Sequence, residues 1–247
     1  MEIDKITDKW FKQTFEKVQE EVNPVTGNDL LIVGVLFAAR KYTRAVLLLL
    51  SQKHALPAKA LLRVLCELFV KIVWCLDIQS NEEDTKERVH MNFQSWDYSR
   101  LIQDKRLLTN LEKYTEGDFG GKVQDALKKA ANDVADYKER PVKCIPPTAD
   151  IFKELSVIEP AMNNIYAEIY QNYSRAVHLD RNTFSRLVQY KGDRIVCYDD
   201  WDDDINDLYA KCLCISCDIN IVIRKHYNWP ADALRNEWLN LTSKHDN

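Results

Sequence analysis

The sequence is poor in the residues that interrupt regular structure. Only six glycines and seven prolines occur in 247 residues, too few for the many tight turns of a β sandwich or barrel. Long segments are filled instead by the good helix formers Ala, Leu, Lys, Glu and Arg. We therefore predict an all-α fold: a multi-helix bundle that forms a single domain over residues 1–247.

One stretch departs from the helical pattern. The segments RLVQY and RIVCY are β-like, and the letters KGD between them favour a turn. We expect a small β-hairpin near 186–199, or else an extended connector. The loop RPVKCIPPTAD makes the region near 140–148 the best candidate for a subdomain boundary.

The sequence also lacks a long uninterrupted apolar run. Its most apolar region, LLIVGVLFAARKYTRAVLLLL, is broken by Arg40, Lys41 and Arg44, which favours a buried core helix over a membrane span. The start MEIDKITDKW is charged and amphipathic, unlike a secretory signal. Seven cysteines are an odd count without secretory context. We expect reduced thiols, a cytoplasmic location and no membrane association.

An excess of positive charge and the common cofactor motifs are missing as well. The net charge of −4 does not favour bulk electrostatic binding to nucleic acid, although a local basic patch would be compatible with it. There is no Walker A or GxGxxG run.

The Asp-rich stretch 199–204 resembles the start of a calcium loop, but Asp207 stands where that loop needs Gly. Cys214 and Cys217 lie within an apolar helical segment, which favours core packing. We expect neither a cofactor nor a metal.

What the sequence does contain is an ion pair in an apolar helix. The segment PAKALLRVLCELFVKIVWCL is apolar on nearly all sides, which is typical of a helix in the middle of a bundle. Arg63 and Glu67 lie in it four positions apart, a spacing that lets them bond each other. Two interpretations remain open: a buried pair that fixes helix register, or a polar cluster that faces a cleft.

A second polar set lies on a later helix, expected near 159–179. Tyr170, Ser174 and His178 recur every four residues, so they form one stripe at the shoulder of the apolar face. Histidine as a residue type titrates near neutrality and is the usual general base, so His178 is a candidate for that role. The alternative is a structural His beside a Ser whose hydroxyl bonds its own helix.

Together these two motifs resemble a bacterial helical domain family of unknown function, with Arg-x-x-x-Glu on one helix and Tyr-x-x-x-Ser-x-x-x-His on a later one. Such proteins look like distant relatives of the HEPN (higher eukaryotes and prokaryotes nucleotide-binding) bundles, many of which are metal-independent ribonucleases of toxin or antiphage systems. The sequence departs from the HEPN ribonuclease signature, an Arg and a more distant His on one helix, because Arg175 and His178 are only three positions apart.

A catalytic role therefore requires both helices. In that hypothesis His178 activates a ribose 2′-hydroxyl, Arg63 stabilises the phosphorane, and Glu67 orients Arg63, while Ser174 and Tyr170 hold the phosphate of an RNA substrate. Two other hypotheses remain open. One is a non-catalytic helical module that binds a protein partner or forms a homodimer; the other is a bundle that senses a small molecule.

Overall fold

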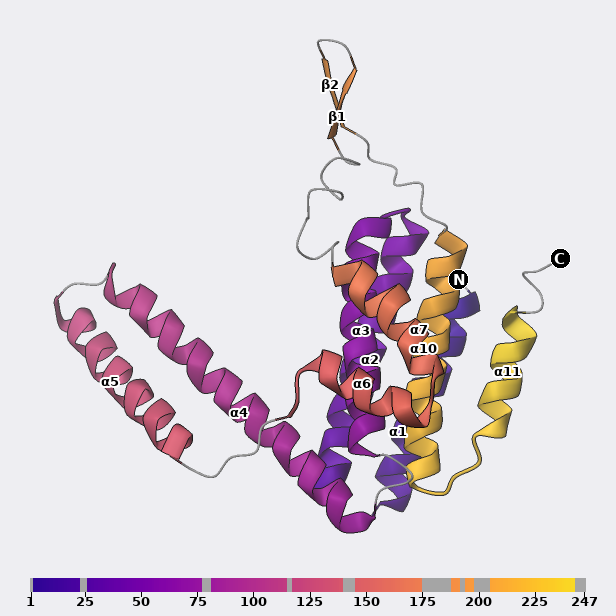
Figure 1. Ribbon diagram of the computed structural model, residues 1–247, viewed down its shortest axis with the longest axis horizontal. Coiled ribbons are helices and arrows are strands. Elements are labelled where there is room, and N and C mark those ends of the chain that lie inside the picture. The colour runs from indigo at the N-terminus through magenta and orange to yellow at the C-terminus, as the bar shows by residue number, and fades with distance from the viewer. Residues whose placement is uncertain are drawn as a thin grey trace. The chain divides into compact units, whose positions relative to one another are not determined.

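The computed structural model describes residues 2–22, 26–76, 81–114, 117–139, 145–174, 188–191, 194–197 and 205–242. Helices make up most of this part of the chain (Figure 1). The prediction of an all-α helical bundle is confirmed.

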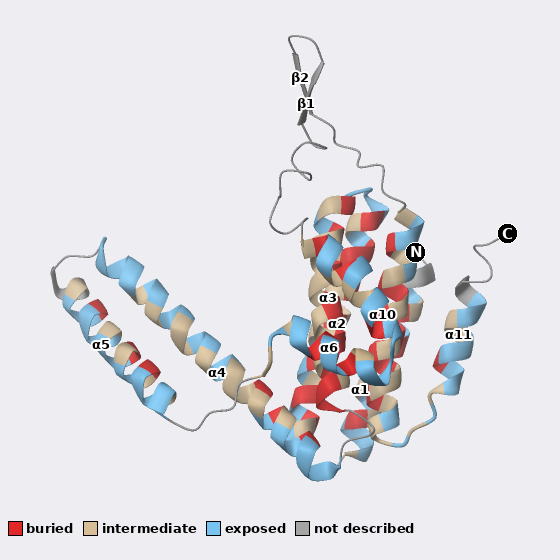
Figure 2. Cartoon of the chain, viewed as in Figure 1, coloured by how far each residue is buried: buried red, intermediate tan, exposed pale blue. Residues whose placement is uncertain are grey.

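Four long helices form the centre of the bundle and pack against one another: α1 (Glu2–Glu21), α2 (Gly27–Ser51), α3 (Ala55–Cys75) and α10 (Ile205–His226). Figure 2 shows how buried residues concentrate on α2, α3 and α10. The apolar region interrupted by Arg40, Lys41 and Arg44 is α2, which lies in this core as expected. A capping box begins α2, because Thr26 and Asp29 bond each other's backbone N–H groups.

Three short elements follow one another beside α3: α6 (Thr148–Ile158), α7 (Ala161–Ile165) and the π-helix η1 (Tyr166–Gln171). The expected apolar face is present, since Met162, Ile169 and Tyr173 are buried. The prediction of one continuous α-helix is wrong over Tyr166–Gln171, where the turns are wider.

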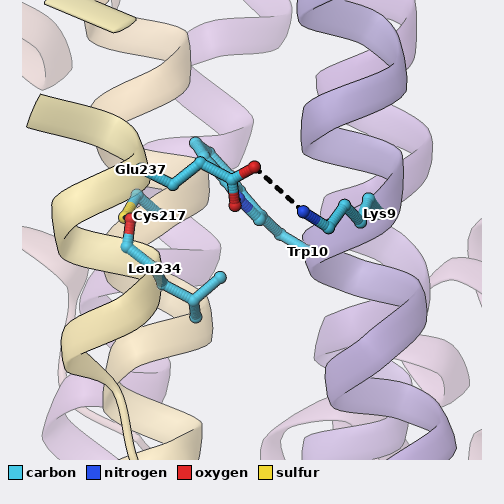
Figure 3. A network of polar contacts seen from close by, with 5 residues as sticks. All are labelled: Lys9, Trp10, Cys217, Leu234 and Glu237. Carbon is cyan, nitrogen blue, oxygen red and sulfur yellow. Dashed lines mark hydrogen bonds and ion pairs between the residues drawn. The ribbon is translucent and has the colours of Figure 1, made fainter. Parts of the chain in front are cut away.

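The helix α11 (Asp232–Thr242) is held against α1 and α10. Glu237 accepts hydrogen bonds from Trp10 Nε1 and Lys9 Nζ, both at 3.0 Å (Figure 3). Leu234 packs in the same place against Trp10 and Cys217. One buried leucine and one carboxylate thus fix this helix on the core.

The expected hairpin is present. Strand β1 (Val188–Lys191) pairs antiparallel with β2 (Arg194–Cys197), with Val188 opposite Cys197 and Lys191 opposite Arg194. Both strands fall within the predicted range 186–199.

The chain divides into two compact units: residues 1–81 with 147–247, and residues 82–146. The second unit contains α4 (Glu82–Glu112) and α5 (Gly117–Glu139), which pack against each other (Figure 1). Tyr98 and Tyr137 stack between them, with ring centroids 5.3 Å apart. The division into compact units does not test independent folding, so the single domain and the boundary near 140–148 stay predictions.

In the part of the chain that the structure describes, no helix has both the length and the apolar character needed to cross a membrane.

Candidate functional site

The predicted ion pair is present on α3. Arg63 Nη2 lies 3.0 Å from Glu67 Oε1, and the two side chains are 18% and 24% exposed. The pair is therefore neither sealed in the core nor free in solvent. Its neighbours along α3, Leu62, Leu65 and Cys66, are fully buried, so the pair lies where the apolar helix reaches the surface.

Tyr170 joins this pair from the π-helix. Arg63 Nη2 also donates a hydrogen bond of 3.3 Å to the Tyr170 hydroxyl, and the guanidinium carbon lies 4.9 Å from the centre of the Tyr170 ring. Tyr170 stacks on Tyr166 at 5.6 Å, and both rings contact the buried Phe152 of α6. The guanidinium is thus held by a carboxylate and by a ring that is itself fixed in place.

Ser174 is in a different situation. Its hydroxyl donates a 2.7 Å hydrogen bond to the backbone carbonyl of Tyr170, which corresponds to the structural alternative for this residue. His178, the predicted general base, lies outside the described residues. The structure therefore brings together Arg63, Glu67 and Tyr170, and it places Ser174 one helical turn further along.

Two lysines extend the cluster beyond the predicted residues. The ammonium groups of Lys59 and Lys211 lie 5.6 Å and 5.9 Å from the centre of the Tyr173 ring. Lys211 also pairs with Asp207 at 2.7 Å. Burial alone would lower the pKa of Lys211, but the bonds to Asp207 and Tyr173 outweigh it and raise that pKa. Lys211 therefore carries a full positive charge at neutral pH.

Sequence reasoning did not place either lysine in this cluster, for different reasons. Lys59 precedes Arg63 by four positions on α3, so the helical period would have revealed it. Lys211 comes from α10, and nothing local in the sequence indicates which face of α10 meets Tyr173.

One polar atom of the cluster is buried without a hydrogen-bond partner among the described residues: the Nε of Arg63. A buried donor left in this way is costly. Arg63 therefore retains hydrogen-bonding capacity that Glu67 and Tyr170 do not use.

The cysteines near the core are poor nucleophiles. Burial raises the pKa of Cys66 on α3, and those of Cys212 and Cys217 on α10, to about 12. Burial likewise raises the pKa of Cys214 to about 11. These thiols stay protonated at neutral pH, in agreement with core packing. Within the described residues, no group of three or more His, Cys, Asp and Glu side chains could hold a metal ion.

Comparison with models of protein families identifies the family of this chain. The model of a family of unknown function, DUF5677, matches residues 29–195, a range that contains all five predicted site residues. No curated protein and no solved structure matches the chain.

Proposed function

The chain belongs to the DUF5677 family, and since that family has no known function, we propose one from the site: a HEPN-like, metal-independent ribonuclease. In this proposal the protein works in the bacterial cytoplasm, as a toxin component of an antiphage defence system. RNA is its substrate, and the reaction centre lies beside Arg63 on α3.

The observation that carries the proposal is the way in which Arg63 is held. Glu67 at 3.0 Å and the Tyr170 ring at 4.9 Å orient the guanidinium without enclosing it, since 18% of the side chain stays exposed. A guanidinium fixed in advance at the protein surface suits the stabilisation of charge that develops on a phosphate.

Tyr170 and Ser174 take roles consistent with this geometry, and the role of His178 rests on the sequence alone. The Tyr170 hydroxyl accepts a bond from Arg63, so its own proton is available to a phosphate oxygen. His178 would act as the general base on the ribose 2′-hydroxyl. Ser174 would contact the phosphate only by giving up its bond to the Tyr170 carbonyl. We therefore assign Ser174 a smaller role than the other four residues.

A second candidate function is a non-catalytic helical module that binds a partner. It is favoured by two contacts within the cluster, because Arg63 pairs with Glu67 and Ser174 bonds its own helix. In that case the same contacts position helices and perform no chemistry.

An RNA cleavage assay distinguishes the two functions. Purified protein is incubated with labelled single-stranded RNA in the presence of EDTA, and the products are tested for 2′,3′-cyclic phosphate ends. We expect cleavage by the wild type, and a rate lower by about 100-fold or more for His178→Ala and for Arg63→Ala. His54→Ala is the matched control, because His54 is exposed at the start of α3 and should leave the rate unchanged.

Two results would contradict the ribonuclease proposal. One is the absence of cleavage by the wild-type protein on RNAs of varied sequence. The other is cleavage that His178→Ala leaves at the wild-type rate. Either result would favour the binding module.

A further inference from the structure

The solvent-facing side of α2 carries an ordered line of six exposed residues, which we call the α2 stripe: Leu30, Gly34, Phe37, Lys41, Arg44 and Leu48. Their spacing of alternating four and three residues keeps them within an arc of about 80° over about 27 Å of helix. The core residues of α2, such as Ile32, Ala39 and Leu50, lie on the opposite side.

The stripe is unusually apolar for an exposed surface. Leu30, Phe37 and Leu48 are 60%, 55% and 63% exposed. Exposed leucines that are scattered singly are ordinary, but three large apolar side chains on one line mark an interaction site. Gly34 lies between them, and a Cβ added there would meet nothing within 4 Å. A partner can therefore approach the α2 backbone closely at this point.

The stripe is complementary to itself when its direction is reversed. In an antiparallel pair centred near Ala39, Leu30 faces Leu48 of the second copy and Phe37 faces its Lys41. Arg44 faces Gly34, the position with the most room for a guanidinium. Lys41 Nζ already lies 4.4 Å from the centre of its own Phe37 ring, so this cation–aromatic contact is within its reach.

A parallel pair lacks this complementarity, because Lys41 would face Lys41 and Arg44 would face Arg44 across the interface. Arg40, which lies beside the stripe, has little effect on the choice between the two arrangements. Its positive charge is neutralised by two hydrogen bonds to Asp8 on α1, at 2.7 Å and 2.8 Å. Charge thus selects the antiparallel arrangement.

We propose that the α2 stripe is the interface of an antiparallel homodimer, in which α2 of one copy packs against α2 of a second. Such a contact is isologous, so the same six residues serve both partners and the assembly closes at two. The inference is independent of the proposed ribonuclease activity, because none of its residues belongs to the Arg63 cluster.

Analytical ultracentrifugation of the full chain over a range of concentrations tests the proposal. We expect the wild type to shift toward twice the monomer mass as concentration rises. Leu30→Asp and Leu48→Asp should each weaken dimerisation by about 100-fold, because each places a carboxylate against a leucine of the second copy. Leu107→Asp on α4 is the matched control: Leu107 is 59% exposed, against 60% for Leu30, and its replacement should leave the dimer intact. Circular dichroism confirms that each variant is folded.

A cross-linking experiment tests the direction of the pair. Gly34→Cys and Arg44→Cys proteins are oxidised separately and as a mixture, with the wild type as background for the native thiols. A disulfide-linked dimer that forms in the mixture, and not in either protein alone, supports the antiparallel register. Three results would overturn the proposal: a wild type that is monomeric at every concentration, a dimer indifferent to the stripe variants, or cross-linking of Gly34→Cys with itself.

Discussion

Arg63 brings a positive charge into a helix that is otherwise largely apolar, and its neighbours explain how the fold tolerates it. Glu67 neutralises the charge at 3.0 Å, and Tyr170 covers the guanidinium with its ring. If only one partner of such a pair is removed, the other is left half-buried and unpaired, which costs more than removing both. The stability of the fold should therefore respond very differently to single and double substitutions here.

We expect Arg63→Ala to lower the free energy of unfolding by about 1–3 kcal/mol, because Glu67 then loses its counter-charge in a half-buried position. The double substitution Arg63→Met with Glu67→Leu should recover most of that loss, since apolar side chains of similar size can pack in place of the ion pair. Urea unfolding followed by circular dichroism measures both effects.

The control for this pair is Arg100→Ala on α4. Arg100 is 69% exposed and lies 3.7 Å from Asp97, so its removal should change the free energy of unfolding by less than about 0.5 kcal/mol. A double variant no more stable than Arg63→Ala would contradict the expectation, and would mean that this position requires charged groups.

The sequence predicts some of this cluster and not the rest, for a physical reason. The bond between Arg63 and Glu67 follows from helical spacing alone. The approach of Tyr170 to Arg63 depends on how two helices pack, and the position of Lys211 beside Tyr173 depends on a third helix, α10. The motif resemblance grouped the residues of two helices, and the sequence left open whether the Ser174 hydroxyl bonds its own helix. The structure shows that it donates to the Tyr170 carbonyl.

At the scale of elements, the π-helical stretch is the clearest departure from the predicted structure. Periodicity predicts one α-helix over 159–179, whereas Tyr166–Gln171 has wider turns. These wider turns let Tyr166 and Tyr170 stack, with an interplanar angle of 21°, while both contact Phe152. Helical propensity is a local property, and it contains no information about rings that meet across elements.

A second feature at this scale joins the start of α2 to the end of α10. Asp29 is only 5% exposed. It accepts hydrogen bonds from Thr26 N and Oγ1, both at 2.6 Å, and another from the Tyr227 hydroxyl. Burial alone would raise the pKa of Asp29, but these bonds outweigh it and hold the pKa below its ordinary value of 3.8. The ionised carboxylate therefore ties the two helix ends together.

We expect Tyr227→Phe to lower the free energy of unfolding by about 1.5–3 kcal/mol at pH 7, because a hydrogen bond to a buried carboxylate is lost. Because the folded-state pKa of Asp29 is depressed, its contribution is fully present above the ordinary pKa of 3.8. It disappears as the pH falls through the lower folded-state value. The difference between wild type and variant should therefore shrink below about pH 4.

Urea unfolding at pH 7 and at pH 3 measures this difference. Tyr114→Phe is the matched control, since Tyr114 is 84% exposed and its hydroxyl should contribute little at either pH. A difference between wild type and Tyr227→Phe that grows as the pH falls would contradict the assignment of Asp29 as the ionised partner.

At the scale of the whole molecule, buried volume is distributed unevenly between the two compact units. Among the described residues, all of the largest fully buried side chains belong to the unit of residues 1–81 and 147–247. They include Trp10 on α1, Leu62 on α3 and Leu208 on α10. In the unit 82–146 the buried apolar residues are fewer and smaller, namely Val89, Val123, Ala130 and Val134. The segments that form α4 and α5 are more polar than those that form α2 and α3, but a polar helix can also lie on the surface of a bundle, so this difference does not by itself predict a separate unit.

The contrast leads to a prediction about folding. A variant in which a flexible Gly/Ser linker of about 15 residues replaces residues 82–146 should still unfold cooperatively, because it keeps the large buried side chains of the core. Its melting temperature should lie within about 5 °C of the wild type.

The separate fragment 82–146 should show no cooperative transition, because two helices with so few buried side chains cannot offset the entropy of ordering the chain. Thermal unfolding of both proteins, followed by circular dichroism, measures this, and the buried Trp10 reports on the core by fluorescence. A linker variant that fails to fold would instead establish that residues 1–247 form one cooperative domain.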